Sequence, residues 1–139
     1  LRAESGAYFD KLILSDQIDM MTQQTSRSRA NSLRQSRFIP AIEYLQANRL
    51  RKRLIQEMFD LFKDYDVIIA PGRGSQQSLI TNLTGHPSIS IPSGFDNKGR
   101  PTSITLIGNL FDEASILRFA NFYQEKTDHE DKYPPIFNN

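Results

Sequence analysis

Three serines lie close to a histidine near the middle of the sequence, at His86, Ser88, Ser90 and Ser93. A serine beside a histidine suggests nucleophilic hydrolysis, because an imidazole can take the proton of an attacking hydroxyl. However, the alternating segment 88–91 puts Ser88 and Ser90 on one face of a strand, and no Gly-x-Ser-x-Gly turn presents a nucleophile. We therefore interpret them as ordinary strand serines beside a turn histidine.

Two other patterns are weak signals for phosphate or metal chemistry. Gly72-Arg73-Gly74 lacks the Lys-Ser/Thr of a phosphate loop and the third glycine of a dinucleotide fingerprint. Asp128-His129-Glu130-Asp131 could ligate a hard cation, but one histidine among adjacent carboxylates in a polar tail fixes no coordination geometry. We expect no metal site and no cofactor, and motifs alone indicate no active site.

Positive charge is concentrated between residues 27 and 53. Glu43 is the one acid there, against eight basic residues: Arg27, Arg29, Arg34, Arg37, Arg49, Arg51, Lys52 and Arg53. The whole chain carries a net charge of only +1, so a solvated helix face with acidic partners elsewhere is the favoured interpretation. Nucleic acid is disfavoured because aromatic stacking residues are not interleaved with the arginines. One or two arginines that reach an anionic ligand remain an alternative.

The composition is that of an ordinary globular chain. It has 139 residues, of which 38% are hydrophobic and 24% charged, and no apolar run approaches the roughly 18 residues of a membrane span. The absence of cysteine excludes disulfides, thiolate metal sites and a cysteine nucleophile. It is compatible with any compartment, and we expect the cytoplasm.

The first half of the chain reads as helical. Apolar residues at helical spacing predict an amphipathic helix over 4–14, and Ser15 followed by Asp16 predicts the start of a second helix. The polar run 23–32 is ambiguous between a loop and a solvent-facing helix. A nearly continuous apolar stripe predicts one long helix over 40–62, with Pro40 in its first turn.

The second half carries strands. The β-branched run 66–71 predicts a strand covered on both faces, followed by a flexible polar loop over 72–78. Alternation over 88–91 and 102–107, with turn residues over 95–101, predicts a hairpin. Asp112-Glu113 opens a final helix, for which we predict a buried face made of Ile116, Leu117, Ala120 and Tyr123.

These elements make a poor closed core. The strand around 67–70 has no obvious sheet neighbours within the chain, which is what a piece of a larger α/β protein would look like. We therefore expect exposed apolar surface and self-association.

Residues 81–95, TNLTGHPSISIPSGF, resemble the C-terminal signature of the amidase signature family, in which an Asn-x-x-Gly-x-Pro turn leads into a strand ending Pro-x-Gly. Gly85 would there permit a positive φ, and Pro87 would give a rigid entry into the strand. The resemblance extends in order over nearly the whole chain, through residues 39–49, 64–71, 99–101, 104–108, 111–113, 124–129 and 134–135.

The resemblance implies the α/β class: the C-terminal portion of the amidase signature fold, with helices packed on part of a mixed β-sheet that includes a β-hairpin. Residues 1–139 would be the C-terminal fragment of an amidase domain, with 1–63 mainly helical and 64–139 forming strands and the final helix. The family hydrolyses amides with a Ser–cis-Ser–Lys triad on its N-terminal part. This chain has no such Gly/Ser-rich loop, and Lys11 lacks the family context. The resemblance thus implies no catalytic residue here and an inactive fragment.

Two enzyme classes and one non-enzyme class stay open. In the A subunits of Glu-tRNA(Gln)/Asp-tRNA(Asn) amidotransferases, an arginine before the long helix holds the substrate carboxylate, which by position implies Arg27 or Arg29. Those proteins also use an acidic residue shortly before the Asn-x-x-Gly-x-Pro turn. The nearest position in this chain is Ser75, and residues 74–82 contain no carboxylate. This departure favours a general amidase. The alternative is a binding or scaffold domain, whose protein partner would meet Arg49–Arg53.

The partners expected from this resemblance are a small-molecule amide substrate, the protein's own N-terminal part and a second copy through self-association. Nucleic acid is expected only for a component of a tRNA amidotransferase, and no membrane is expected.

Overall fold

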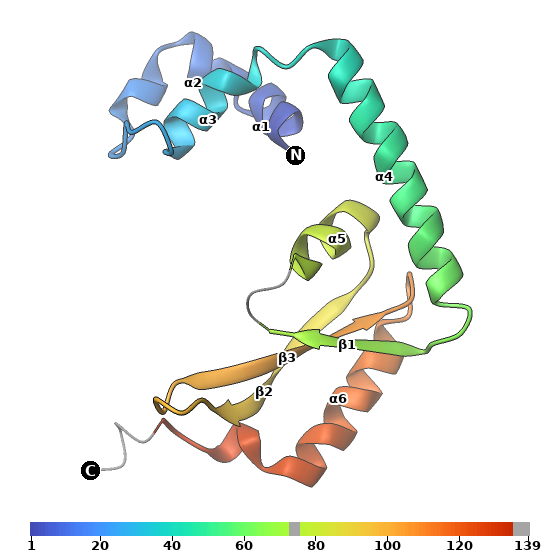
Figure 1. The fold of residues 1–139 in the computed structure, drawn as a ribbon. Helices are drawn as coiled ribbons and strands as arrows, with labels where there is room; N and C mark the ends of the chain where they lie inside the picture. The colour runs from blue at the N-terminus through green and yellow to red at the C-terminus, as the bar shows by residue number, and fades with distance from the viewer. Residues whose placement is uncertain (73–75, 135–139) are drawn as a thin grey trace. The chain divides into compact units, whose positions relative to one another are not determined.

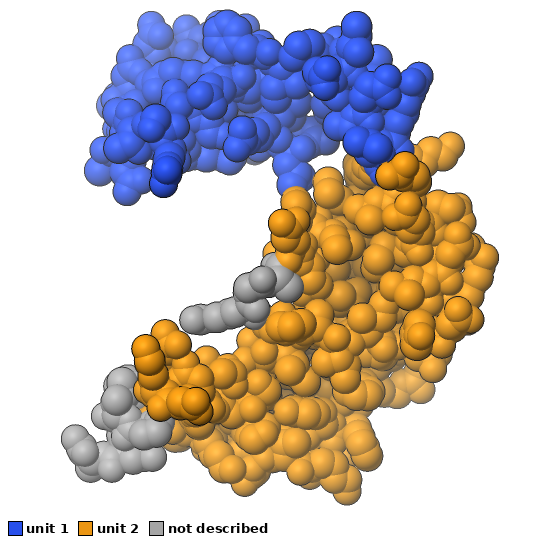
Figure 2. All heavy atoms as spheres, viewed as in Figure 1, with its two compact units in different colours: residues 1–50 blue, residues 51–139 orange. Residues whose placement is uncertain are grey.

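A computed structural model describes residues 1–72 and 76–134. The chain divides into two compact units, residues 1–50 and residues 51–139 (Figure 2). Among the described residues, one buried apolar cluster belongs to the first unit and two belong to the second. No described helix is long and apolar enough to cross a membrane.

The first unit is built from short helices: α1 (Arg2–Tyr8), α2 (Asp10–Leu14), the 3₁₀-helix η1 (Gln17–Met20) and α3 (Arg29–Ser36). The single helix predicted over 4–14 is interrupted at Phe9, which ends α1 and begins α2. Ser15 is not the N-cap of the next helix, because Asp16 takes that place in the left-handed region. Of the ambiguous polar run, residues 23–28 precede α3, and the rest lies within that helix.

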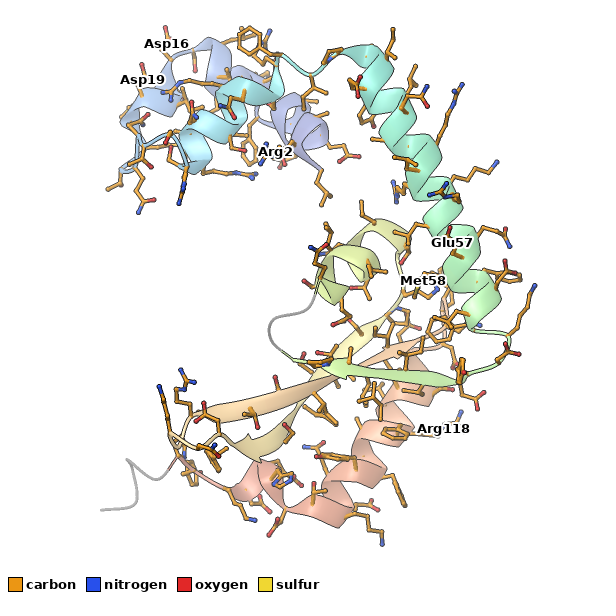
Figure 3. All side chains as sticks on the ribbon, viewed as in Figure 1. Arg2, Asp16, Asp19, Glu57, Met58 and Arg118 are labelled. Atoms are coloured by element: carbon orange, nitrogen blue, oxygen red, sulfur yellow. The ribbon has the colours of Figure 1, made fainter. Side chains whose placement is uncertain are left out.

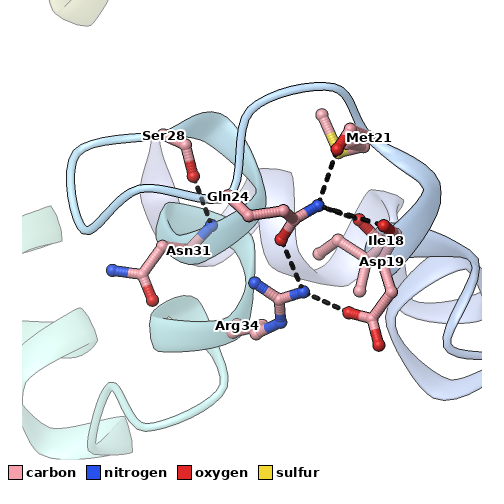
Figure 4. A network of polar contacts seen from close by, with 7 residues as sticks. All are labelled: Ile18, Asp19, Met21, Gln24, Ser28, Asn31 and Arg34. Atoms are coloured by element: carbon pink, nitrogen blue, oxygen red, sulfur yellow. Dashed lines mark hydrogen bonds and ion pairs between the residues drawn. The ribbon is translucent and has the colours of Figure 1, made fainter.

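A small core and several polar contacts hold this unit together. Its buried residues are Ile18, Ala30 and Leu33. Gly6 of α1 lies so close to α3 that a Cβ atom there would overlap Ser36 Oγ, so the contact requires glycine. The side chain of Ser28 caps α3 by accepting the Asn31 N–H at 3.3 Å (Figure 4).

Gln24 and Arg34 form the centre of the polar network in Figure 4. Gln24 Nε2 donates to the carbonyl oxygens of Ile18 at 3.0 Å and Met21 at 2.8 Å. Arg34 donates to Gln24 Oε1 at 3.0 Å and forms an ion pair with Asp19. The loop after η1 is therefore tied to α3 mainly by directional contacts.

The long predicted helix is present as α4 (Ala41–Leu61), with each end within one residue of the prediction. The boundary between the two units falls inside α4. Its apolar stripe is buried only towards its C-terminal end, where Met58 is 8% exposed (Figure 3). Nearer the N-terminal end, Ile42, Leu45 and Leu50 are exposed.

The second unit contains an antiparallel sheet of β1 (Val67–Pro71), β2 (Ser88–Phe95) and β3 (Pro101–Gly108), in the order β1-β3-β2. The predicted hairpin is confirmed: β2 pairs directly with β3, with Ile89 opposite Leu106. The register shifts between Pro92 and Gly94, where Gly94 has a φ of +107°.

Helices cover both faces of this sheet (Figure 1). On one face, α6 (Glu113–Thr127) packs Ile116 and Ala120 against Ile91 and Leu106. On the other face, the end of α4 and the helix α5 (Gln77–Thr84) pack around Ile107. The described part of the chain ends after the 3₁₀-helix η2 (His129–Asp131).

The strand β1 was predicted to be covered on both faces, but in the structure the cover is only partial. Val67 packs against the α6 cluster, and Ile68 and Ala70 pack on the opposite face. Ile69, however, remains 55% exposed. Among the described strands, β3 is the single neighbour of β1.

Two further predictions are wrong. The predicted polar loop over 72–78 is wrong at its last two residues, because α5 begins at Gln77; residues 73–75 of that loop lie outside the described residues. Thr81 and Thr84 are accommodated in the helix because their hydroxyls donate to the carbonyls one turn back. Leu117 is 54% exposed rather than buried, since α6 meets the sheet through Ile116 and Ala120.

Candidate functional site

The serines that suggested a nucleophile form hydroxyl pairs across the hairpin. Ser90 Oγ lies 2.9 Å from Thr105 Oγ1, and Ser93 Oγ lies 3.1 Å from Thr102 Oγ1. Ser88 and Ser90 are both exposed, as their shared face predicts. The paired hydroxyls join β2 to β3 through side chains as well as through the backbone.

His86 is held by buried contacts away from these serines. Its ring stacks on Phe62, with the ring centroids 5.1 Å apart and the planes at 15°. Its Nδ1 atom lies 2.8 Å from Thr84 Oγ1, whose own proton is directed to the Ile80 carbonyl. That arrangement assigns the His86 proton to Nδ1, and burial lowers the pKa of the imidazole. The structure therefore gives His86 a packing role at the entrance to β2.

The turn before His86 has the backbone that the motif predicts. Gly85 follows the last residue of α5 with a φ of +84°, so it ends the helix in the left-handed conformation. Its N–H donates to the Thr81 carbonyl at 2.8 Å. In addition, Arg51 of α4 donates from Nε to the Leu83 carbonyl at 2.5 Å, which satisfies another terminal carbonyl of α5.

The candidate functional site is an open pocket of about 250 Å³ where β1 ends beside the β2–β3 turn. The lining residues are Pro71, Gly72, Asp96, Arg100, Pro101, Thr102 and Ser103. Gly72 donates its N–H to the Ser103 carbonyl at 2.9 Å. A Cβ atom on Gly72 would overlap Ser103, so the close approach of the two backbones depends on glycine.

An internal ion pair dominates the electrostatics of the pocket. Asp96 accepts the backbone N–H of Arg100 at 2.9 Å, and its other oxygen accepts the Arg100 guanidinium at 2.7 Å. These bonds lower the pKa of Asp96 to about 2, so the carboxylate stays ionised and balances Arg100. The pocket offers hydroxyls and backbone groups beside a neutralised pair, which suits an uncharged polar group better than a free anion.

Arg27 and Arg29, the proposed carboxylate-binding residues, both lie in the first unit. Arg29 opens α3, and its guanidinium lies 5.9 Å from the centre of the Phe9 ring. Arg27 is exposed and makes no hydrogen bond or ion pair with any described residue. Arg34 and Arg37 are paired with Asp19 and Asp10, so their charges are already balanced. Within residues 27–37, Arg27 is thus the arginine most available to a ligand.

The C-terminal acidic cluster has structural contacts. Asp128 pairs with Lys132 at 2.9 Å, and the His129 ring lies beside Tyr123 with the centroids 6.2 Å apart. Within residues 1–72 and 76–134, no group of three side chains is arranged to hold a metal ion. Arg73 and Gly74 of the phosphate-loop pattern, and Ser75, lie outside the described residues.

The pocket joins segments that are far apart in the sequence, and sequence reasoning missed it. The Gly72 and Ser103 segments meet because Pro71 pairs with Ile104 in the register of β1 and β3. The one available signal was the Pro-Gly step after the strand, which ends β1 and leaves its last backbone groups close to β3.

No family model matches the chain. Over 110 aligned residues it is 34% identical to the A subunit of glutamyl-tRNA(Gln) amidotransferase from Nitrosospira multiformis, covering 66% of this chain and 23% of that protein. The same protein from Oceanobacillus iheyensis is 31% identical over 112 residues, covering 67% of this chain and 23% of its own length. The chain therefore spans about a quarter of the length of these curated relatives.

Two solved structures share the fold. An amidase family protein from Bacillus anthracis str. Ames superposes with a TM-score of 0.62 and 19% identity, covering 76% of this chain and 21% of that one. A structure described as an unexpected vestigial protein complex, which reveals the evolutionary origins of an s-triazine catabolic enzyme, superposes with a TM-score of 0.71 and 20% identity. The superposition covers 91% of this chain and 32% of that chain.

These comparisons confirm the α/β fold class and the resemblance that the motifs predicted. The curated relatives resemble this chain in sequence and the solved structures resemble it in fold, and both point to the same kind of protein. Over its C-terminal part, this chain is similar to the proteins of the amidase signature family.

Proposed function

We propose that this chain is the C-terminal part of an amidase signature hydrolase, which cleaves an amide C–N bond of a small-molecule substrate. The observation that carries the proposal is the similarity to amidotransferase A subunits, of whose length the chain spans about a quarter. The proposal treats residues 1–139 as one C-terminal segment of the amidase domain. It assigns the two serines and the lysine of the triad to the part that precedes them.

The proposed chemistry is acyl transfer through a covalent intermediate. A serine hydroxyl attacks the amide carbonyl while the lysine, acting through the second serine, takes its proton. Backbone N–H groups stabilise the negative charge on the carbonyl oxygen. That proton then passes to the departing amine, and water hydrolyses the acyl-enzyme. In this scheme residues 1–139 supply pocket wall and specificity rather than the reacting groups.

The pocket from Gly72 to Ser103 would line part of the substrate site. Its balanced Asp96–Arg100 pair favours a neutral polar substituent of the substrate over a free anion. A substrate that also carries a carboxylate would need a separate cation, for which we propose Arg27 or Arg29. A guanidinium can bind a carboxylate through two parallel hydrogen bonds, and Arg27 has no competing described partner.

The second candidate is the A subunit of a tRNA-dependent amidotransferase, which releases ammonia from glutamine for transfer to a tRNA-linked acceptor. The names of the relatives favour it, since the curated proteins described above are such subunits. The absence of a carboxylate from residues 74–82 counts against it. Activity on glutamine with a tRNA-linked acceptor would decide between the two.

The decisive experiment compares the 139-residue chain with a longer protein that includes the preceding part of its reading frame. Both are assayed against small amides and against glutamine. We expect turnover by the longer protein only. Turnover by the short chain that is lost in Ser88→Ala or Ser90→Ala would overturn the assignment of chemistry to the preceding part. A longer protein without the serine loop and the lysine would instead support a binding or scaffold domain.

The proposed arginine contact has its own test in the longer protein. Arg27→Ala or Arg29→Ala should raise KM for a carboxylate-bearing amide severalfold and leave kcat nearly unchanged, because the contact is made equally in the ground and transition states. Arg49→Ala, which removes an exposed positive charge from α4, is the matched control. Unchanged kinetics in both variants would remove the contact from the proposal.

A further inference from the structure

The acid in the pocket that Gly72 and Ser103 line has all its acceptor sites occupied. Asp96 Oδ1 accepts the backbone N–H groups of Lys98 at 2.8 Å and Arg100 at 2.9 Å. Asp96 Oδ2 accepts Arg100 Nε at 2.7 Å and lies 2.7 Å from Arg100 Nη2. An ionised carboxyl group offers about four acceptor sites, so these contacts leave Asp96 no acceptor for a ligand.

The side-chain groups that stay available in this pocket are donors. Among residues 1–72 and 76–134, neither Ser103 Oγ nor Arg100 Nη1 takes part in a hydrogen bond. The third polar group, Thr102 Oγ1, is already paired with Ser93 Oγ at 3.1 Å. A serine hydroxyl and a guanidinium nitrogen can both donate. A ligand in the pocket should therefore bring an acceptor atom.

Two proline rings form the apolar walls of the pocket. Pro71 and Pro101 both line it, and a proline side chain loses almost no rotamer entropy when a ligand packs on it. A cavity of about 150 Å³ can hold a benzene ring. The volume of about 250 Å³ here has room for one ring with one small polar substituent. Apolar walls with a few placed polar groups are the usual composition of a small-molecule site.

The charge of the pocket disfavours an anion. Arg100 alone would attract a carboxylate, but the ionised Asp96 lies 2.7 Å from its guanidinium and balances the charge. A carboxylate that approached Arg100 would also approach Asp96, and it would lose part of its hydration shell. A carbonyl oxygen accepts the same hydrogen bonds and pays neither cost.

We propose that this pocket binds a planar, uncharged ring substituent of the amide substrate, which packs on Pro71 and Pro101 and whose carbonyl oxygen accepts a hydrogen bond from Ser103 Oγ. The inference rests on the proposed function, because that makes the chain part of an amidase. It names the substrate class as amides that carry a second, neutral acceptor on a ring. Ser103 then determines specificity, and Asp96 keeps anions out.

The first test measures the binding of three probes of similar shape to the longer protein: acetophenone, isopropylbenzene and benzoate. The backbone amide resonance of Gly72 reports on the pocket, because Gly72 lines it. We expect acetophenone to shift this resonance and to bind more tightly than benzoate. A Gly72 resonance that acetophenone leaves unchanged, or tighter binding of benzoate, would overturn the proposal.

The variant Ser103→Ala tests the hydrogen bond. We expect it to weaken the binding of acetophenone by about threefold to tenfold, which corresponds to one net hydrogen bond. The binding of isopropylbenzene, which has no acceptor, should not change. The matched control is Ser88→Ala, because Ser88 is an exposed serine of β2 that does not line the pocket. Equal effects of Ser103→Ala on the two probes would contradict the proposal.

The variant Asp96→Asn tests the exclusion of anions. It removes the negative charge and keeps an acceptor oxygen, so Arg100 is no longer balanced. We expect benzoate to bind about threefold more tightly at low ionic strength, with acetophenone nearly unchanged. Asp128→Asn is the matched control, since Asp128 also pairs with a basic side chain, Lys132 at 2.9 Å, and lies outside the pocket lining. Benzoate binding that Asp96→Asn leaves unchanged would remove this role of Asp96 and overturn the assigned substrate class.

Turnover separates this inference from the proposed function. The longer protein is assayed with benzamides whose para substituent is acetyl, isopropyl or carboxylate. Ser103→Ala should raise KM for the acetyl compound alone and leave kcat nearly unchanged. Hydrolysis without these preferences would keep the proposed function and overturn this inference. The probe preferences in a longer protein that hydrolyses no amide would support the pocket assignment and overturn the proposed function.

Discussion

The two units are stabilised in different ways. The first unit has a cluster of three buried apolar residues, and polar contacts centred on Gln24 and Arg34 tie its loop to α3. The second unit places apolar clusters on both faces of a sheet. A net hydrogen bond contributes about 0.5–1.5 kcal/mol, whereas burying one large aliphatic side chain contributes about 1.5–3 kcal/mol. The first unit should therefore open locally at a lower free energy than the second.

The largest expected effect is in the sheet core. Leu106 is 0% exposed and packs among Ile91, Ile116 and Ala120, so Leu106→Ala should lower the free energy of unfolding of the second unit by about 3–5 kcal/mol. Leu33→Ala should lower that of the first unit by about 2–3 kcal/mol, because fewer neighbours surround the cavity. Hydrogen exchange resolved by peptide would measure both. An equal loss in the two units would contradict the comparison.

Helix caps give the next largest effect and allow a matched test in both units. Ser28 caps α3 and Asp112 caps α6, each by accepting a backbone N–H at 3.3 Å. Replacing either with alanine should cost about 1 kcal/mol, measured by urea unfolding. Ser26→Ala is the control, since the described contact of Ser26 is made by its backbone carbonyl. In exchange experiments, Ser28→Ala should loosen α3 further than Asp112→Ala loosens α6, because the surrounding core is smaller.

Arg51 and Arg53 lie two positions apart on α4, but their side chains should contribute different amounts to stability. Arg51→Met removes the bond to the Leu83 carbonyl and should destabilise α5 by about 0.5–1.5 kcal/mol. Arg53→Met removes only an exposed ion pair with Glu57, with N–O at 3.4 Å, and should cost less than about 0.5 kcal/mol. Thermal unfolding of both variants would measure the difference. Equal values would show that the Arg51 bond does not stabilise α5.

The smallest expected effect is a loss of stability that is absent at neutral pH and appears when the pH is lowered. Burial holds the pKa of His86 in the folded chain below its ordinary value of 6.5. Between the two pKa values the unfolded chain binds more protons, so the free energy of unfolding of the second unit should fall as the pH is lowered below about 6.5. Above that pH this contribution is constant. His86→Gln should reduce the slope in urea titrations between pH 7 and 5, and an unchanged slope would exclude His86 as its source.

Sequence patterns predicted the parts of the fold that local chemistry determines. The long helix and the hairpin follow from apolar periodicity and from the turn residues between β2 and β3. The positive φ of Gly85 follows from its place in the motif. The short helix α5 was missed because its threonines disfavour helix in isolation, and its packing near Ile107 overrides that preference. Leu117 was misplaced because helical spacing does not reveal how wide the buried face is.

The site was less predictable than the fold. The amidase resemblance was visible in the sequence, but the pocket depends on the pairing of Pro71 with Ile104, which lie far apart along the chain. The interpretation of His86 as a turn histidine omitted its stacking on Phe62, for the same reason. The sequence also offered the serines as independent hydroxyls, whereas the structure uses Ser90 and Ser93 as halves of cross-strand pairs.

The hydroxyl pairs between β2 and β3 have a consequence for how this sequence can diverge. Replacing one member of a pair leaves the other hydroxyl without its partner, whereas replacing both with apolar residues of similar shape can be nearly neutral. Replacing Ser90 alone is therefore penalised relative to the joint substitution, because it leaves the buried Thr105 hydroxyl without its partner. Positions 90 and 105, and likewise 93 and 102, should covary among descendants of this gene, with polar pairs exchanging for aliphatic pairs as units.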